Sequence, residues 1–215
     1  MLLIFDLDGV LEAEEKLIES RFRALIKSVM KKFDISKESA LEKFSQAKKK
    51  MSAQGKPATI YAMNELGFSR KEFFNILDSV DPVGLIERHK NCIEMLKVVK
   101  KNRLVVYSNS PRKVSLKCMK ILEVDKYIEK LYSAEQFDES KPSVKNLKFI
   151  LKEEGFKPED SVFIGNSYGK DIAPAKIAGM ITILFDPERK KEKKDSDYLV
   201  RDLMEIAGIV GKAKT

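Results

Sequence analysis

Two aspartates separated by one residue, Asp6 and Asp8, directly follow the apolar stretch Met1–Phe5. Alternate side chains of an extended chain share a face, so the two carboxylates point roughly the same way. Such a pair repels itself in a cleft unless a divalent cation neutralises it. An oxygen-only set without His or Cys suits a hard cation such as Mg²⁺. The pair therefore predicts a Mg²⁺ site at the end of the first strand.

Other polar residues stand at the ends of later apolar stretches or in the loops beyond them. They are Ser108, Asn109, Lys141, Asn166, Ser167 and Asp171. A hydroxyl, a lysine and main-chain N–H groups at helix starts give a phosphate group the positive surroundings that it needs. An aspartate can also act as a nucleophile and form an aspartyl-phosphate. Together these residue types indicate phosphoryl chemistry.

Strands that alternate with helices must position these residues. We expect strands at 1–5, 103–107, 161–164 and 181–185, a short strand at 127–132, and helices at 89–101, 111–122, 143–153 and 171–178. This alternation predicts an α/β fold, a Rossmann-like three-layer α/β/α core with a doubly wound parallel sheet. Chemistry in such sheets gathers at the carboxyl ends of the strands, where the polar residues stand.

A helical block interrupts the alternation after the first strand. Apolar residues recur at helical spacing from Glu12 onward, and no strand is expected before about Pro82. Within the block we expect a loop at 48–57, because that stretch is polar and contains Gly55 and Pro57. The chain is therefore predicted to comprise a core domain, residues 1–11 and 83–215, and an inserted helical domain, residues 12–82.

Composition excludes several classes of protein. The chain has 215 residues, 43% of them hydrophobic, and no apolar run long enough for a membrane span or a signal peptide, so we expect a cytoplasmic protein without a membrane partner. The net charge is +8, yet the lysines are scattered apart from a run at 190–194. Nucleic acid is not expected as a partner, since a nucleic-acid footprint needs basic residues clustered on one face. Cys92 and Cys118 are expected to be buried free thiols.

Four segments, taken in order, resemble the motifs of the haloacid dehalogenase (HAD) superfamily. They are Asp6-Leu7-Asp8-Gly9-Val10, Ser108-Asn109, Lys141-Pro142 and Gly165-Asn166-Ser167 with Asp171. The resemblance covers about residues 1–11 and 83–210. The helical block resembles the cap that is inserted after the first motif in the first subclass of this family, and the motif set resembles its phosphatase branch.

The resemblance implies a role for most of these residues. Asp6 would attack phosphorus, and Asp8 would protonate the leaving oxygen and then activate water. Ser108, with the backbone of Asn109, would bind the phosphoryl group, and Lys141 would balance charge on both the nucleophile and the phosphate.

Three more residues complete the expected site. Asp171 would hold Mg²⁺ together with Asp6 and the main-chain carbonyl of Asp8. Asn166 stands where the family's last motif usually carries an acid, and its amide oxygen is a candidate metal ligand without charge. Arg112 follows Ser110-Pro111 and is a candidate for binding a substrate anion.

The function expected from this resemblance is Mg²⁺-dependent hydrolysis of a small phosphomonoester, a phosphorylated metabolite of the sugar phosphate, phosphoglycolate or nucleotide type. Asp8 favours phosphate chemistry, because the dehalogenase members lack an acid at this position. Two alternatives stay open: a phosphomutase of the same family, and a weakly active or non-catalytic phosphoester-binding member with Asn166 in place of the acid. The sequence predicts neither the substrate nor the oligomeric state.

Overall fold

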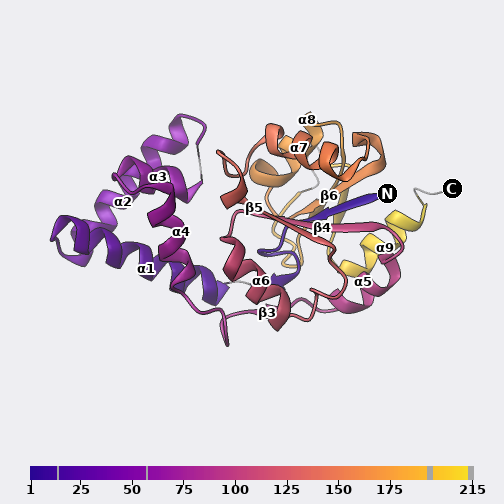
Figure 1. Cartoon of the computed structure of the whole chain (residues 1–215), viewed down its shortest axis with the longest axis horizontal. Helices are drawn as coiled ribbons and strands as arrows, with labels where there is room; N and C mark the ends of the chain where they lie inside the picture. Colours follow the sequence, from indigo (N-terminus) through magenta and orange to yellow (C-terminus); the bar gives the residue numbers. More distant parts are fainter. Residues whose placement is uncertain (14, 57, 193–195, 213–215) are drawn as a thin grey trace. The chain divides into compact units, whose positions relative to one another are not determined.

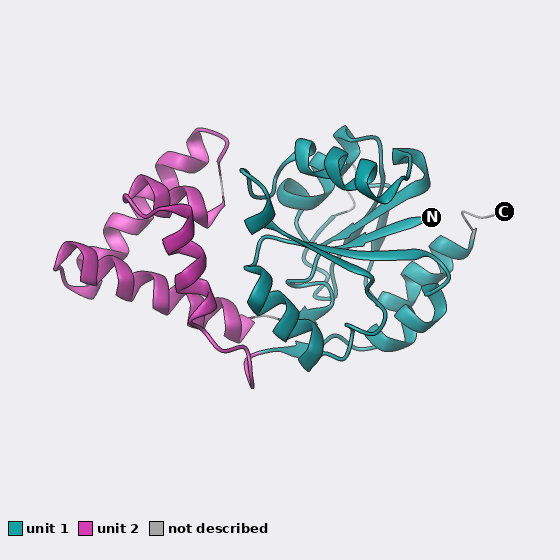
Figure 2. Cartoon of the chain, viewed as in Figure 1, with its two compact units in different colours: residues 1–13, 86–215 teal, residues 14–85 magenta. Residues whose placement is uncertain are grey.

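The computed structural model describes residues 1–13, 15–56, 58–192 and 196–212. Pro57 of the expected loop, and Lys193 and Lys194 of the lysine run, lie outside the described residues. The chain divides into two compact units (Figure 2). We call residues 1–13 and 86–215 the core unit, and residues 14–85 the helical unit.

The core unit is built on one parallel sheet with the strand order β5-β4-β1-β6-β7-β8. Its strands are β1 (Leu2–Phe5), β4 (Arg103–Ser108), β5 (Lys130–Ser133), β6 (Ser161–Gly165), β7 (Ile181–Phe185) and β8 (Tyr198–Val200). Every pair of neighbours in this sheet is parallel. The predicted α/β class with a parallel sheet is confirmed.

Helices cover both faces of this sheet. They are α5 (Cys92–Val99), α6 (Arg112–Ile121), α7 (Val144–Glu154), α8 (Ala173–Ile177) and α9 (Leu203–Lys212). In Figure 1, α7 and α8 lie on one side of the strands, and α5, α6 and α9 lie on the other. Because both faces are covered, β1 and β6 are buried along their whole length, which explains why parallel strands read as continuous apolar runs.

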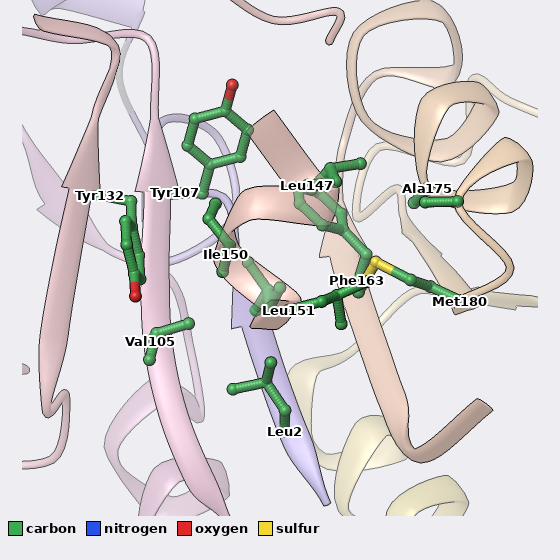
Figure 3. Packing of buried hydrophobic residues seen from close by; sticks show 12 residues of the cluster. Leu2, Val105, Tyr107, Tyr132, Leu147, Ile150, Leu151, Phe163, Ala175 and Met180 are labelled. Atoms are coloured by element: carbon green, nitrogen blue, oxygen red, sulfur yellow. The ribbon is translucent and has the colours of Figure 1, made fainter. Parts of the chain in front are cut away.

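A hydrophobic cluster joins the sheet to the helices on one of these faces (Figure 3). It includes Leu2 and Ile4 of β1, Val105 and Tyr107 of β4, Phe163 of β6, and Leu147, Ile150 and Leu151 of α7. The three strands end within two residues of one another, since Phe5 pairs with Val106 and Ile164 while β4 ends at Ser108 and β6 at Gly165. The residues that follow β1, β4 and β6 therefore meet at one edge of the sheet.

The helical unit contains α1 (Glu15–Phe33), α2 (Lys37–Ala53), α3 (Thr59–Glu65) and α4 (Arg70–Asp78). The expected loop at 48–57 is wrong in its first half, because α2 continues to Ala53. Residues 48–53 include lysines, alanine and Met51, all of which favour helix, and Met51 is buried. No described helix is both long and apolar enough to cross a membrane.

A small antiparallel pair lies where the chain leaves and re-enters the core unit. β2 (Glu12–Ala13) pairs with β3 (Glu87–Arg88). We expected helix from Glu12 onward and no strand before about Pro82. Both expectations are wrong at Glu12 and Ala13, which form β2. Two-residue strands carry no periodic signal, so only the tertiary pairing reveals them.

Both cysteines are buried and free, as predicted. Burial raises the pKa of Cys92 to about 12, which disfavours its thiolate. This thiol therefore behaves as a small apolar side chain of α5.

Candidate active site

Asp6 is the first residue after β1, and the sheet fixes its backbone because its N–H donates to Ile164 O of β6 at 2.8 Å. The residue is buried, and its side chain is 8% exposed. Carboxylate Oδ1 accepts hydrogen bonds from the Leu7 N–H at 2.8 Å and from Lys141 Nζ at 2.7 Å. Both donors select the same oxygen, so the carboxylate is held in one orientation with Oδ2 turned away from them.

Lys141 lies in the loop before α7 and is the cation at the centre of the site. Its buried ammonium contacts Asp6 Oδ1 at 2.7 Å and Asp171 Oδ1 at 2.9 Å. The rings of Tyr107 and Phe163 lie 5.4 and 5.8 Å from Nζ. Burial alone would lower the pKa of Lys141, but the carboxylates of Asp171 and Asp6 outweigh burial and raise it. Lys141 is therefore protonated across the neutral pH range.

The side chain of Asn109 fixes the backbone of Lys141. Its Oδ1 accepts the Lys141 N–H at 2.7 Å, and its Nδ2 donates to Lys141 O at 3.1 Å. On the other side, Ser143 caps α7 by accepting the Asn146 N–H at 3.2 Å. Lys141 is thus held between the end of β4 and the start of α7, and the Asn109 side chain serves as a positioning group.

Asp171 lies in a π-helical turn, Tyr168–Ile172, that follows β6. Its second oxygen, Oδ2, accepts the Ser167 N–H at 3.0 Å. The turn is packed closely on the strand end, because a Cβ atom at Gly165 would lie 2.3 Å from Asp171 Cβ and 2.9 Å from Oδ2. Glycine at this position therefore lets the Asp171 carboxylate reach Lys141.

Asp8 is held by two hydroxyl groups from the end of β4. Ser108 Oγ donates to Asp8 Oδ2 at 2.6 Å, and Ser110 Oγ lies 2.9 and 3.0 Å from the two carboxylate oxygens. Ser108 Oγ also accepts the Ser110 N–H at 2.9 Å. Ser110 is not among the residues predicted for the site from the sequence. Its position two residues after Ser108, where an extended chain repeats the same face, is the signal that could have found it.

The electrostatics of the site centre on Asp6. Burial raises the pKa of Asp6 to about 7; the Lys141 ammonium opposes this shift, and the carboxylates of Asp171 and Asp8 add to it. Two carboxylates, those of Asp6 and Asp171, share the one buried ammonium of Lys141, so this group of three carries excess negative charge when both are ionised. A cation bound here would favour the ionised form of Asp6.

Six predicted site residues gather at the carboxyl ends of β1, β4 and β6: Asp6, Asp8, Ser108, Asn109, Lys141 and Asp171. Arg112 does not join them, since it is exposed and its Nη1 donates to Leu131 O of β5 at 3.0 Å. Asn166 is half-buried beside them, and its main-chain O accepts Lys191 Nζ at 2.7 Å.

The donor set of this cluster fits Mg²⁺. Among the described residues, no three Asp, Glu, His or Cys side chains form a ready-made metal cage. Mg²⁺ does not require one, because it usually binds through one or two carboxylates and takes waters and phosphate oxygens as its remaining ligands. Asp6 and Asp171, both joined to one Lys141 ammonium, supply two buried carboxylates whose excess negative charge favours a hard cation.

Comparison with known proteins agrees with this geometry. Glyceraldehyde 3-phosphate phosphatase from Methanocaldococcus jannaschii is 34% identical over 96 residues, 43% of this chain and 42% of that protein. Phosphoglycolate phosphatase 1 from Pseudomonas aeruginosa is 26% identical over 102 residues, 46% of this chain and 37% of that protein. The matched part of the chain spans less than half the length of either curated relative.

The fold and the family model extend this likeness over most of the chain. The crystal structure of a HAD phosphatase from Thermococcus onnurineus superposes with a TM-score of 0.73 at 21% identity, covering 98% of this chain and 97% of that one. Residues 3–185 match the family described as haloacid dehalogenase-like hydrolase. The family predicted from the four motifs is confirmed, and the chain belongs to the haloacid dehalogenase-like hydrolases.

Proposed function

We propose that this protein is a Mg²⁺-dependent phosphatase that hydrolyses a small phosphomonoester through an aspartyl-phosphate intermediate. The observation that carries the proposal is the pairing of Lys141 with both Asp6 and Asp171, at 2.7 and 2.9 Å, beside a second aspartate that two serines hold. This arrangement supplies a nucleophile, a fixed cation and a separate acid–base group. Phosphoryl transfer is catalysed mainly by such positioning and electrostatic stabilisation.

In the first half-reaction Asp6 acts as the nucleophile. Lys141 and the Leu7 N–H both bind Oδ1, which presents Oδ2 for attack on phosphorus. The bond between phosphorus and the ester oxygen breaks as the Asp6–phosphorus bond forms, and the carboxylic acid of Asp8 gives its proton to the departing oxygen. The Lys141 ammonium offsets the negative charge that would otherwise keep the phosphate away from the carboxylates.

In the second half-reaction Asp8 acts as the base. Its carboxylate takes a proton from a water molecule, whose oxygen attacks phosphorus and displaces Asp6. Inorganic phosphate leaves, and both aspartates return to their starting states with Asp8 protonated. The hydroxyls of Ser108 and Ser110 keep Asp8 in one place through both steps, which is the function of a positioned general acid–base group.

Mg²⁺ would be held by Asp6, Asp171 and the main-chain carbonyl of Asp8, with the amide oxygen of Asn166 as a further candidate ligand. When bound, the ion supplies positive charge that stabilises the phosphoryl oxygens. Asn166 adds no charge of its own, so the acidic part of this ligand set rests on Asp6 and Asp171.

We also propose that residues 14–85 act as a cap that selects the substrate. The described residues of this range form one compact unit, which contains α1 to α4 and is inserted after the first motif. Glyceraldehyde 3-phosphate and phosphoglycolate are the first candidate substrates, because proteins named for hydrolysing them match this chain over 96 and 102 residues. Both molecules are small phosphomonoesters.

Hydrolysis of p-nitrophenyl phosphate tests the proposal, with and without Mg²⁺. We expect Mg²⁺-dependent release of p-nitrophenol, and a loss of at least about 10³-fold in kcat for Asp6→Asn, because the amide is not a nucleophile. Asp138→Asn is the matched control, since this carboxyl is 97% exposed and pairs only loosely with Lys145 at 3.9 Å. Equal activity of Asp6→Asn and wild type would refute the mechanism.

A panel of phosphoesters separates the two alternatives. A phosphomutase would convert a sugar phosphate into its isomer and release little phosphate, which phosphorus NMR detects. A non-catalytic phosphoester-binding protein would bind members of the panel in calorimetry without turning them over. Absence of phosphate release from the whole panel would reject the phosphatase proposal.

A further inference from the structure

The described residues 186–192, which follow β7, bring a second lysine to the residue after β6. Asp186, the first residue after β7, is buried, and its carboxylate accepts the Lys191 N–H at 2.7 Å and pairs with Arg201 Nη1. Arg201 Nη2 donates to Lys191 O at 2.9 Å. The backbone of Lys191 is therefore held at both its N–H and its carbonyl by one ion pair, in which Asp186 is buried and Arg201 is partly exposed.

The side chain of Lys191 points from this loop to the residue after β6. Its Nζ donates to Asn166 O at 2.7 Å. The next residue, Ser167, uses its N–H to hold Asp171 Oδ2 at 3.0 Å. An ammonium group has three N–H donors, and Asn166 O takes one of them. Because Lys191 is exposed, its other donors can reach a ligand from solvent.

The surroundings leave the charge of Lys191 available to an anion. Asn166, on which the ammonium rests, is neutral. Glu188 forms its close ion pair with Lys190 at 2.7 Å. Within the described residues, the structure thus holds the Lys191 ammonium beside Asn166 without a close carboxylate partner.

We propose that Lys191 is a substrate-binding residue whose ammonium donates to an oxygen of the phosphoryl group, as a second lysine beside Lys141. The inference rests on the proposed function, because it needs a phosphorylated ligand at the carboxyl ends of β1 and β6. Fixing a long flexible lysine on a ligand costs both side-chain rotamer entropy and backbone freedom. The Asp186–Arg201 pair orders the Lys191 backbone in advance, so part of the ordering cost is met before the ligand arrives.

Three variants test this role: Lys191→Met removes the charge, Lys191→Arg keeps it, and Lys190→Met removes the neighbouring charge that pairs with Glu188. The probe is inorganic phosphate, whose Kd is measured by calorimetry with Mg²⁺ present. KM and kcat for p-nitrophenyl phosphate are measured in parallel. Thermal unfolding of each variant checks that the fold is retained.

We expect Lys191→Met to raise both the Kd for phosphate and KM by about tenfold, the effect of losing one charge-assisted hydrogen bond. Because Asp6 and Asp8 stay in place, kcat should change by less than about threefold. Lys191→Arg should recover most of the affinity, and Lys190→Met should match wild type.

Two results would overturn the proposal. One is an unchanged phosphate Kd and KM in Lys191→Met; the other is the same loss in Lys190→Met, which would show a general effect of surface charge. A wild-type protein that binds phosphate but hydrolyses no ester would instead reject the phosphatase function. In that case the phosphate Kd of Lys191→Met would still decide whether Lys191 binds the anion.

Discussion

Replacing Gly165 by alanine tests how closely the end of β6 and Asp171 must approach each other. The new Cβ would lie 2.3 Å from Asp171 Cβ, 2.8 Å from Cγ and 2.9 Å from Oδ2, whereas ordinary contacts of this kind begin at 3.4 Å. Gly165 is the last residue of β6, whose backbone is paired on both sides by β1 and β7, so the strand has little room to shift. The turn that carries Asp171 must move instead.

The size of the effect follows from these distances. Relieving the closest contact requires a displacement of about 1 Å, and misplacements of this size near a reacting centre cost about 10²-fold in rate. Asp171 holds Lys141 at 2.9 Å and the Ser167 N–H at 3.0 Å, and a shift of this size breaks both contacts. Overpacking of this kind also destabilises a fold by about 1–3 kcal/mol. We therefore expect kcat/KM to fall about 10²-fold while the protein remains folded at 25 °C.

The assay measures kcat/KM for p-nitrophenyl phosphate over a range of Mg²⁺ concentrations, together with urea unfolding. Gly169→Ala is the matched control from the same motif, since a Cβ at Gly169 would meet nothing within 4 Å. The Gly165→Ala variant should need more Mg²⁺ for half-maximal activity, because Asp171 is a proposed ligand. If Gly165→Ala keeps wild-type kcat/KM and the same Mg²⁺ requirement, close packing of this glycine does not position Asp171.

Three further predictions concern single residues. Ser110→Ala removes a hydroxyl that donates to Asp8, the proposed acid–base residue. We expect kcat to fall about fivefold, because one such hydrogen bond contributes roughly 1 kcal/mol. An unchanged kcat in steady-state kinetics would exclude a positioning role for Ser110. Asn166→Asp adds a charged ligand and should lower the Mg²⁺ concentration for half-maximal activity; an equal or higher requirement would contradict it. Burial opposes ionisation of Glu154, but hydrogen bonds from Tyr132 and Arg103 prevail and lower its pKa below the ordinary value of 4.5. The ionised carboxylate therefore stabilises the fold at neutral pH, and this stabilisation is lost as the pH falls through the lowered pKa. Glu154→Gln should cost about 2 kcal/mol at pH 7, and urea unfolding should show the gap to wild type narrowing below about pH 4; a gap that does not depend on pH would refute this reasoning.

The sheet was largely predictable because parallel strands covered on both faces are uninterrupted apolar runs. The sequences of β1, β4, β6 and β7 consist mainly of apolar residues. These strands are buried along almost their whole length. β8 and α9 were not predicted. β8 has only three residues, and α9 contains Gly208 and Gly211, which weaken the helical signal although the helix packs on α5.

The site was predictable as a set of residues at strand ends, and less so as a set of contacts. Because β1 lies between β4 and β6, the residues at their carboxyl ends meet at one edge of the sheet. The ion pairs of Lys141 with Asp6 and Asp171 follow from that proximity. Spacing does not reveal that the Asn109 side chain binds the Lys141 backbone, or that the Arg112 guanidinium binds Leu131 O. Such hydrogen bonds depend on the register of neighbouring strands and on loop geometry, which local sequence does not determine.

Charge links the basic composition of the chain to its acidic site. The whole chain carries a net charge of +8, yet at the site the two carboxylates of Asp6 and Asp171 share the one buried ammonium of Lys141. A phosphate ester approaching these carboxylates is repelled until a cation reverses the local sign. The overall positive field increases the rate of encounter with an anion, but only over distances up to about the 8–10 Å Debye length at physiological salt. At short range only positive charges close to the carboxylates act on the ligand. In the proposed mechanism, Lys141, a bound Mg²⁺ and Lys191 therefore contribute more to phosphate binding than the scattered surface lysines.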